Sequence, residues 1–168
     1  MLKPAQNYIT EIQGKYAEHL YDIAYQWYYT YAGTRIPNIP DNTYNSHWFA
    51  SVDSNNDVIG IITYSINEAA RSCYNFGIMS FNRGNLQFLR DVKQVIDDIF
   101  HKYNFNRIDF SCFADNPALR GYRRFIKKYG GREVGIYRQC NMLMDGKLHD
   151  AVIFEILKND YIERKRQR

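Results

Sequence analysis

The chain has 168 residues, of which 45% are hydrophobic and 24% charged, and this is ordinary usage for one globular domain with a substantial core. The formal net charge of +4 gives only weak support to a role in binding nucleic acid. Three cysteines, Cys73, Cys112 and Cys140, lie far apart and form no C-x-x-C pair. Neither a disulfide framework nor a zinc site is therefore indicated.

Other classes of protein are disfavoured by local pattern. Met1 to Asn7 leads into no apolar segment, and no apolar run has the length of a membrane span, so we predict a cytoplasmic protein without a membrane partner. The four histidines share no metal-ligand spacing with one another or with the cysteines, and we expect no metal site. Without repeats or linkers, residues 1–162 should form a single domain. Residues 163–168 carry four basic side chains against one acid, which predicts a basic tail without regular structure.

The first half of the chain reads as a helix followed by strands. Between Gly14 and Tyr31 the spacing of Ala17, Leu20, Ala24, Tyr28 and Tyr31 predicts an amphipathic helix. A loop should follow over Gly33 to Asn45, which is rich in Pro, Asn and Asp. Alternating strands are then expected at Trp48 to Val52 and Val58 to Ile66, joined by a hairpin turn, and at Asn75 to Phe81.

The second half alternates between strand and helix. A helix is expected from Asn82 to Tyr103, a strand at Arg107 to Phe113, and a basic helix at Asn116 to Gly131. In the first helix we expect Asp91 on the solvent side and one buried face made of Leu89, Val92, Ile96, Ile99 and Tyr103. In the second helix the apolar stripe is Leu119, Tyr122, Ile126 and Tyr129.

A long β-hairpin should close the chain. Alternation from Val134 to Met142 runs into Asp145-Gly146, a strong hairpin-turn signal, and resumes from Val152 to Ile156. The predicted fold is therefore α/β, with a mixed sheet of six or seven strands, a central parallel βαβα unit and a C-terminal β-hairpin. The strands at Asn75 to Phe81 and Arg107 to Phe113 should be parallel neighbours.

Two short motifs add a resemblance to a known family. Asn116-Pro117-Ala118-x-x-x-Tyr122 opens the basic helix, which a glycine pair closes, and Arg83-Gly84 lies at an earlier turn from strand to helix. In this, the chain resembles the GNAT N-acetyltransferase superfamily. Residues 145–150 and 154–157 are similar to the last hairpin of its ribosomal-protein-type branch. The pyrophosphate loop is altered, because Leu86 and Phe88 stand where the family usually has glycines.

The resemblance implies transfer of an acetyl group from acetyl-CoA, as co-substrate, to an amine of a small molecule or a protein. It implies that Tyr122 is the general acid that reprotonates the CoA thiolate. It places the backbone of Ile78 and Ser80, together with Asn116, against the pantetheine arm, and Arg123 in the basic helix near the adenosine 3′-phosphate. The residues expected under the pyrophosphate, at a helix N-terminus, are Arg83, Gly84, Asn85, Leu86 and Gln87.

Several alternatives stay open at this point. Tyr122 also fits a packing role, and the expected β-strand before the loop contains no acid, so Glu68, Asp109, Glu155 or a water could act as the base. The chain could also be a non-catalytic ligand-sensing or interaction module of the same fold. A nucleic-acid-binding domain is a third alternative, with a basic helix face that could equally be solvated: Arg120, Arg123, Arg124, Lys127, Lys128 and Arg132.

Overall fold

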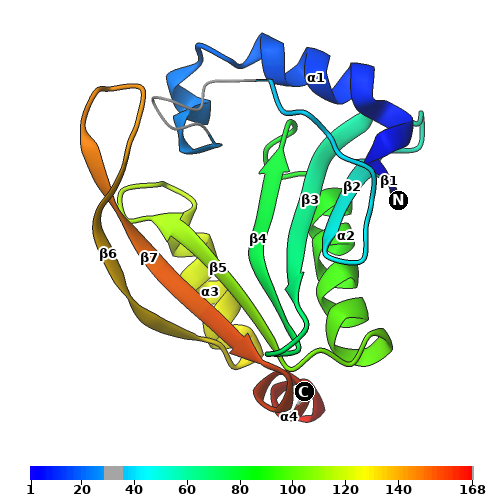
Figure 1. Ribbon diagram of the computed structural model, residues 1–168, viewed down its shortest axis with the longest axis vertical. Helices are drawn as coiled ribbons and strands as arrows, with labels where there is room; N and C mark the ends of the chain where they lie inside the picture. Colours follow the sequence, from blue (N-terminus) through cyan, green and yellow to red (C-terminus); the bar gives the residue numbers. More distant parts are fainter. Residues whose placement is uncertain (29–35, 168) are drawn as a thin grey trace.

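The computed structural model describes residues 1–28 and 36–167 and contains a single seven-stranded sheet in the order β1-β2-β3-β4-β5-β7-β6 (Figure 1). The strands are β1 (Leu2–Pro4), β2 (Ser46–Val52), β3 (Val58–Asn67), β4 (Ser72–Ser80), β5 (Arg107–Phe113), β6 (Arg132–Met142) and β7 (Leu148–Leu157). The helices are α1 (Ile9–Glu18), α2 (Leu86–Asp97), α3 (Leu119–Tyr129) and α4 (Lys158–Arg166). Shorter helical segments are η1 (Ala5–Tyr8), η2 (Ile23–Tyr28) and η4 (Asp98–Lys102).

The sheet separates two hydrophobic cores. The helix-side core packs α2, α3 and α4 against one face, with Ile108, Phe154 and Tyr161 fully buried at its centre. The α1-side core packs Ile12 and Tyr16 against the first strands on the other face. Figure 1 shows α1 lying across one end of the sheet and α2 and α3 behind it. The predicted α/β fold with a mixed sheet is confirmed.

β4 and β5 are parallel neighbours, as predicted, but only at their first residues. Ser72 pairs with Arg107 and Cys73 with Ile108, and no later pair joins the two strands. The register of β4 against β3 shifts at this level, and Asn75 has a positive φ of 51°. Such a bulge bends a strand, which here accompanies the divergence of β4 from β5 that is visible in Figure 1. We call the divergence of residues 74–80 from residues 109–113 the splay.

The C-terminal hairpin is confirmed, and β7 lies between β5 and β6. β7 pairs with every residue of β5, from Arg107↔Leu157 to Phe113↔Ala151. The predicted turn contains Gly146 at a φ of +74°, a conformation that glycine adopts without strain.

The expected helix from Gly14 to Tyr31 was wrong. Helix α1 spans Ile9–Glu18 and buries Ile12 and Tyr16 instead of Ala17 and Leu20, while η2 forms a separate 3₁₀ segment. Between the two, the imidazole of His19 stacks on Tyr25 at 3.9 Å between ring centroids. This aromatic packing folds the chain back, and tertiary contact thus overrides the helical period. Tyr31 lies outside the described residues.

Three further expectations need correction. Of the predicted buried face, Val92, Ile96 and Ile99 are buried, whereas Leu89 is 55% and Tyr103 46% exposed. Phe88 and Val95 are buried beside them instead. Asp91, expected in solvent, is buried and accepts hydrogen bonds from Ser51 Oγ and Gln87 Nε2, each at 2.7 Å. The tail expected from residue 163 instead continues α4 as far as Arg166.

Candidate active site

The splay leaves two strand edges without strand partners. Beyond Cys73, β4 pairs only with β3, and beyond Ile108, β5 pairs only with β7. Helices α2 and α3 begin just after the ends of these two strands. In open sheets, ligands bind where the carboxyl ends of parallel strands diverge and helices begin. The open end of the splay is therefore the candidate site.

Segment η2 bridges this open end. Arg83, just beyond β4, donates from a guanidinium nitrogen to the carbonyl oxygen of Ala24 at 2.7 Å, and the guanidinium lies 5.0 Å from the ring centroid of Tyr25. Burial raises the pKa of the Tyr28 phenol, and the backbone of Ser80, at the end of β4, acts in the opposite direction. On the β5 side, Trp27 packs on Phe113 at 6.3 Å between centroids. Both diverging strands are thus tied to one segment, which the sequence pattern did not indicate.

Tyr122 projects from α3 onto the sheet. Its ring lies 5.6 Å from that of Phe110 and 6.4 Å from that of Phe154, so it packs against the helix-side core. Its hydroxyl forms no hydrogen bond with any described residue. Burial raises the pKa of the phenol, and the neighbouring Cys112 and Tyr28 raise it further. The group therefore stays protonated at neutral pH and has a proton to donate, although its raised pKa makes it a weaker acid than a free phenol.

The turn from β4 into α2 is open to solvent. Gly84 has a φ of +76°, and no atom lies within 4 Å of the position that a Cβ would take. Asn85 caps the helix, its Oδ1 accepting from the Phe88 amide at 3.1 Å. Leu86 is 67% exposed, whereas Phe88 is only 3% exposed and packs in the helix-side core. The Phe88 side chain therefore points away from this backbone and leaves it accessible.

The other predicted cofactor-binding residues lie in different surroundings. Ile78 packs against the helix-side core, and Ser80 Oγ donates to the Asn82 carbonyl at 2.7 Å. Asn116 Oδ1 accepts from the Ala118 amide at 2.9 Å and so organises the start of α3. The side chain of Gln87 is held by its bond to the buried carboxylate described above.

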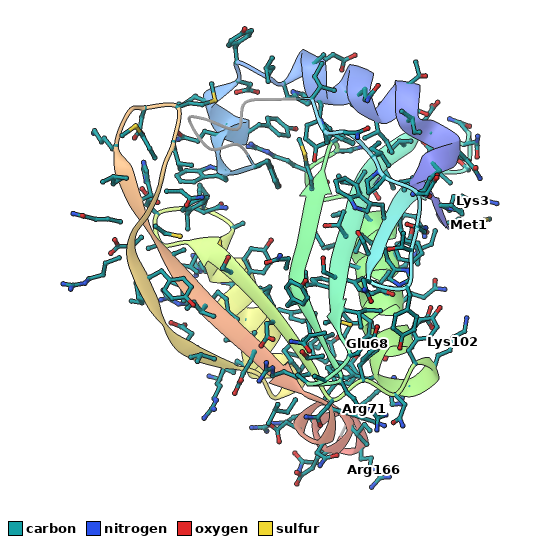
Figure 2. All side chains as sticks on the ribbon, in the orientation of Figure 1. Met1, Lys3, Glu68, Arg71, Lys102 and Arg166 are labelled. Atoms are coloured by element: carbon teal, nitrogen blue, oxygen red, sulfur yellow. The ribbon has the colours of Figure 1, made fainter. Side chains whose placement is uncertain are left out.

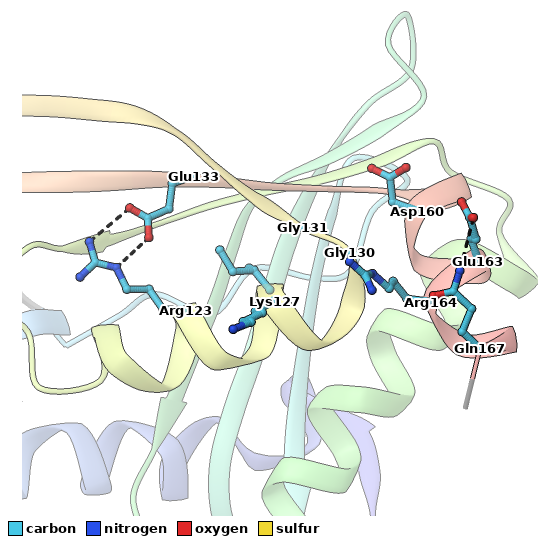
Figure 3. Close-up of a pocket in the computed structure, with 10 residues that line it drawn as sticks. Arg123, Lys127, Gly130, Gly131, Glu133, Asp160, Glu163, Arg164 and Gln167 are labelled. Carbon is cyan, nitrogen blue, oxygen red and sulfur yellow. Dashed lines mark hydrogen bonds and ion pairs between the residues drawn. The ribbon is translucent and has the colours of Figure 1, made fainter.

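Arg123 lies apart from these residues. It makes a two-point ion pair with Glu133, at 2.7 and 3.2 Å, on the outer side of α3 (Figure 3). This pair borders a groove of about 760 Å³ between α3, the start of β6 and α4. Basic and acidic side chains both line the groove, among them Lys127, Arg164 and Asp160. It is separate from the splay.

Two of the candidate bases lie together. Asp109 and Glu155 are directly opposite each other on β5 and β7. Arg107 bonds Asp109 at 3.0 Å and Arg132 bonds Glu155 at 2.6 Å. Burial raises the pKa of Asp109, Glu155 raises it further, and Arg107 acts in the opposite direction.

The third candidate base, Glu68, is remote. It lies in the β3–β4 turn at the closed end of the splay, next to Arg71 (Figure 2). A thiol nucleophile is also disfavoured, since burial raises the pKa of Cys112 to about 12. Among residues 1–28 and 36–167, no group of three His, Cys, Asp or Glu could hold a metal ion, and no helix is long and apolar enough to cross a membrane.

One cluster beside the site escaped the sequence analysis. His149, at the start of β7, contacts Asp115 and Asp145 and packs near Trp27. The signal present in the sequence was the i, i+4 spacing of Asp145 and His149 across the hairpin turn. Asp145 was interpreted only as part of the hairpin turn, and Asp115 is remote in sequence.

Comparison with known proteins gives a clear result for the fold. No protein-family model and no curated protein sequence matches the chain. Mutant forms of the spermidine/spermine N-acetyltransferase SpeG from Vibrio cholerae superpose with a TM-score of 0.69 at 18% identity, over 98% of each chain. A chimera of Vibrio cholerae SpeG and hSSAT superposes with a TM-score of 0.68 at 18% identity, over 96% of this chain and 98% of that chain. SpeG from Vibrio cholerae in complex with manganese ions superposes with a TM-score of 0.62 at 21% identity, over 89% of this chain and 74% of that chain. The fold is therefore of the GNAT type.

Proposed function

We propose that this protein is an N-acetyltransferase that moves the acetyl group of acetyl-CoA to a primary amine. The observation that carries the proposal is the splay, in which β4 and β5 part after two paired residues and a protonated phenol, Tyr122, packs on Phe110 of β5. The similar solved structures are spermidine N-acetyltransferases, which supports a polyamine-like amine as the acceptor.

The open turn before α2 fits the anionic part of acetyl-CoA. The first-turn amides of an α-helix have no partners within the helix, and Asn85 occupies only that of Phe88. Gly84 leaves space beside this backbone, and the helix dipole favours an anion there. The free edge of β4, including Ile78 and Ser80, would hold the pantetheine arm. When bound, acetyl-CoA supplies the acetyl thioester.

Two groups of this chain would handle protons. The Tyr122 hydroxyl has no partner among described residues and would donate a proton to the departing thiolate. Asp109, whose pKa burial raises, would accept the proton of the amine through water, since it follows the last β4–β5 pair at the narrow end of the splay. The buried Oε1 of Gln26, on η2, has no hydrogen-bond partner within residues 1–28 and 36–167 and could accept from an ammonium group.

The assay that tests this proposal is thiol release from acetyl-CoA with spermidine, spermine and a short diamine as acceptors. Turnover with at least one polyamine, together with a rise in melting temperature caused by acetyl-CoA, supports it. A melting temperature unaffected by acetyl-CoA would contradict it. Binding of acetyl-CoA without turnover would instead indicate the non-catalytic module. The cytoplasmic location, the ribosomal-protein-type branch and the altered pyrophosphate loop stay predictions.

A further inference from the structure

Three segments far apart in sequence meet at His149. Its Nδ1 lies 2.6 Å from Asp115 Oδ2, in the loop between β5 and α3, and its Nε2 lies 3.0 Å from Asp145 Oδ1, in the hairpin turn. Trp27 of η2 approaches the imidazole edge-on at 6.1 Å, and Phe113 does so at 6.3 Å. The side chain of His149 is only 8% exposed, so these contacts form most of its surroundings.

Both ring nitrogens of His149 face carboxylate oxygens, which accept but cannot donate. Each nitrogen must then carry a proton, so the ring is an imidazolium in this arrangement. The hydrogen bond to Asp145 raises the pKa of His149 most, partial burial lowers it, and Asp115 raises it again. The other two ring contacts, Trp27 and Phe113, carry no charge. Above the raised pKa one proton is lost and one of the two bonds fails.

The cluster is placed where it can influence the splay. Asp115 immediately precedes Asn116, which organises the start of the helix that carries Tyr122. Trp27 belongs to η2, in which the Ala24 carbonyl accepts a hydrogen bond from Arg83 just beyond β4. The contacts of His149 therefore fix the lead-in to α3 and the bridging segment η2 relative to the hairpin.

We infer that His149 is a positioning residue for amine binding, which through Asp115, Asp145 and Trp27 holds the segments at the open end of the splay. This inference rests on the proposed function. Neither acetyl-CoA binding at the α2 turn nor the Tyr122 hydroxyl depends directly on His149, so its loss should weaken amine binding more than it slows the chemical step.

The first test needs no enzymatic activity. In a Trp48→Phe background Trp27 is the remaining tryptophan, and an adjacent imidazolium quenches indole emission more than a neutral imidazole does. Emission should increase as pH rises, with a midpoint above the ordinary histidine value of about 6.5. The transition should disappear in His149→Gln, and Asp115→Asn should lower its midpoint. An emission profile that is identical in wild type and His149→Gln would overturn the inference.

The second test is kinetic. In His149→Gln the KM for the amine should rise at least about tenfold, while kcat and the Kd for acetyl-CoA change less, and the wild-type KM should rise over the pH range of the emission change. His101→Gln, a partly exposed histidine on η4, is the matched control and should change none of these values. An unchanged amine KM in His149→Gln would overturn the inference. A wild type without turnover on any amine, but with the emission transition intact, would instead contradict the proposed function.

Discussion

Replacing Tyr122 by Phe separates catalysis from packing at the residue where both roles are combined. The ring would keep its contacts with Phe110 and Phe154, at 5.6 and 6.4 Å. The hydroxyl has no hydrogen-bond partner among the described residues, so its removal should change the free energy of unfolding by less than about 1 kcal/mol. A proton donor is worth roughly 10²–10⁴ in rate, or about 2.7–5.4 kcal/mol in the activation free energy.

The assay is steady-state thiol release with a polyamine, combined with calorimetry for acetyl-CoA and a urea denaturation curve. We expect kcat to fall by roughly 10²–10⁴ while acetyl-CoA affinity and the urea midpoint stay near wild type. Tyr44→Phe, at a tyrosine that is 65% exposed and remote from the splay, is the control. Full activity in Tyr122→Phe, or a loss of stability without a selective loss of rate, would refute the donor role.

Three further predictions concern stability. Partial burial raises the pKa of Asp97, but hydrogen bonds from Lys165, Lys93 and Tyr161 outweigh this effect and lower the pKa to about 2. The stabilisation of the folded state by ionised Asp97 should therefore be complete above about pH 4 and disappear toward pH 2. Melting temperatures of wild type and Asp97→Asn should thus converge on acidification. Phe88→Ala should lower the free energy of unfolding, measured by urea denaturation, by about 3–5 kcal/mol, because the ring is buried. A Phe88 ring exposed in the phosphate-binding loop would instead tolerate the replacement. Gly130→Ala should lower the free energy of unfolding by more than about 1 kcal/mol, since φ is +84° and a Cβ would lie 2.8 Å from the Asp160 carbonyl oxygen. The control Gly14→Ala, where a Cβ would have no atom within 4 Å, should not lower it.

Much of the sheet was predictable because its patterns are local. Strand Arg107–Phe113 was correct to the residue, since Ile108, Phe110 and Cys112 alternate and are all buried. The Asp145-Gly146 turn likewise depends on the chemistry of adjacent residues. The parallel neighbours followed from the strand–helix–strand order, because a helical crossover returns the chain in the same direction.

The errors arose where a distant partner decides the outcome. Asp91 is buried because Ser51, forty residues earlier, supplies a hydrogen bond, and no helical period can reveal this. The aromatic residues around Tyr25 looked like the end of a long helix but instead fold back onto His19. The cluster around His149 joins residues from three segments. For the candidate site, the sequence pointed to Tyr122 and the α2 turn. The place of η2 across the open end of the splay could be seen only in the structure.

The position of β7 between β5 and β6 imposes an order on biosynthesis. β5 gains only two backbone partners from β4, and its fully paired edge must wait for β7. Ala151, the partner of Phe113, is made 38 residues later (151 − 113), which takes about 2–8 s at a synthesis rate of roughly 5–20 residues per second. For that interval a nascent chain holds an apolar strand with one edge unpaired and the other paired only at Arg107 and Ile108. A chaperone that shields Ile108 and Phe110 on the ribosome should therefore raise the yield of folded protein more than one that acts after release.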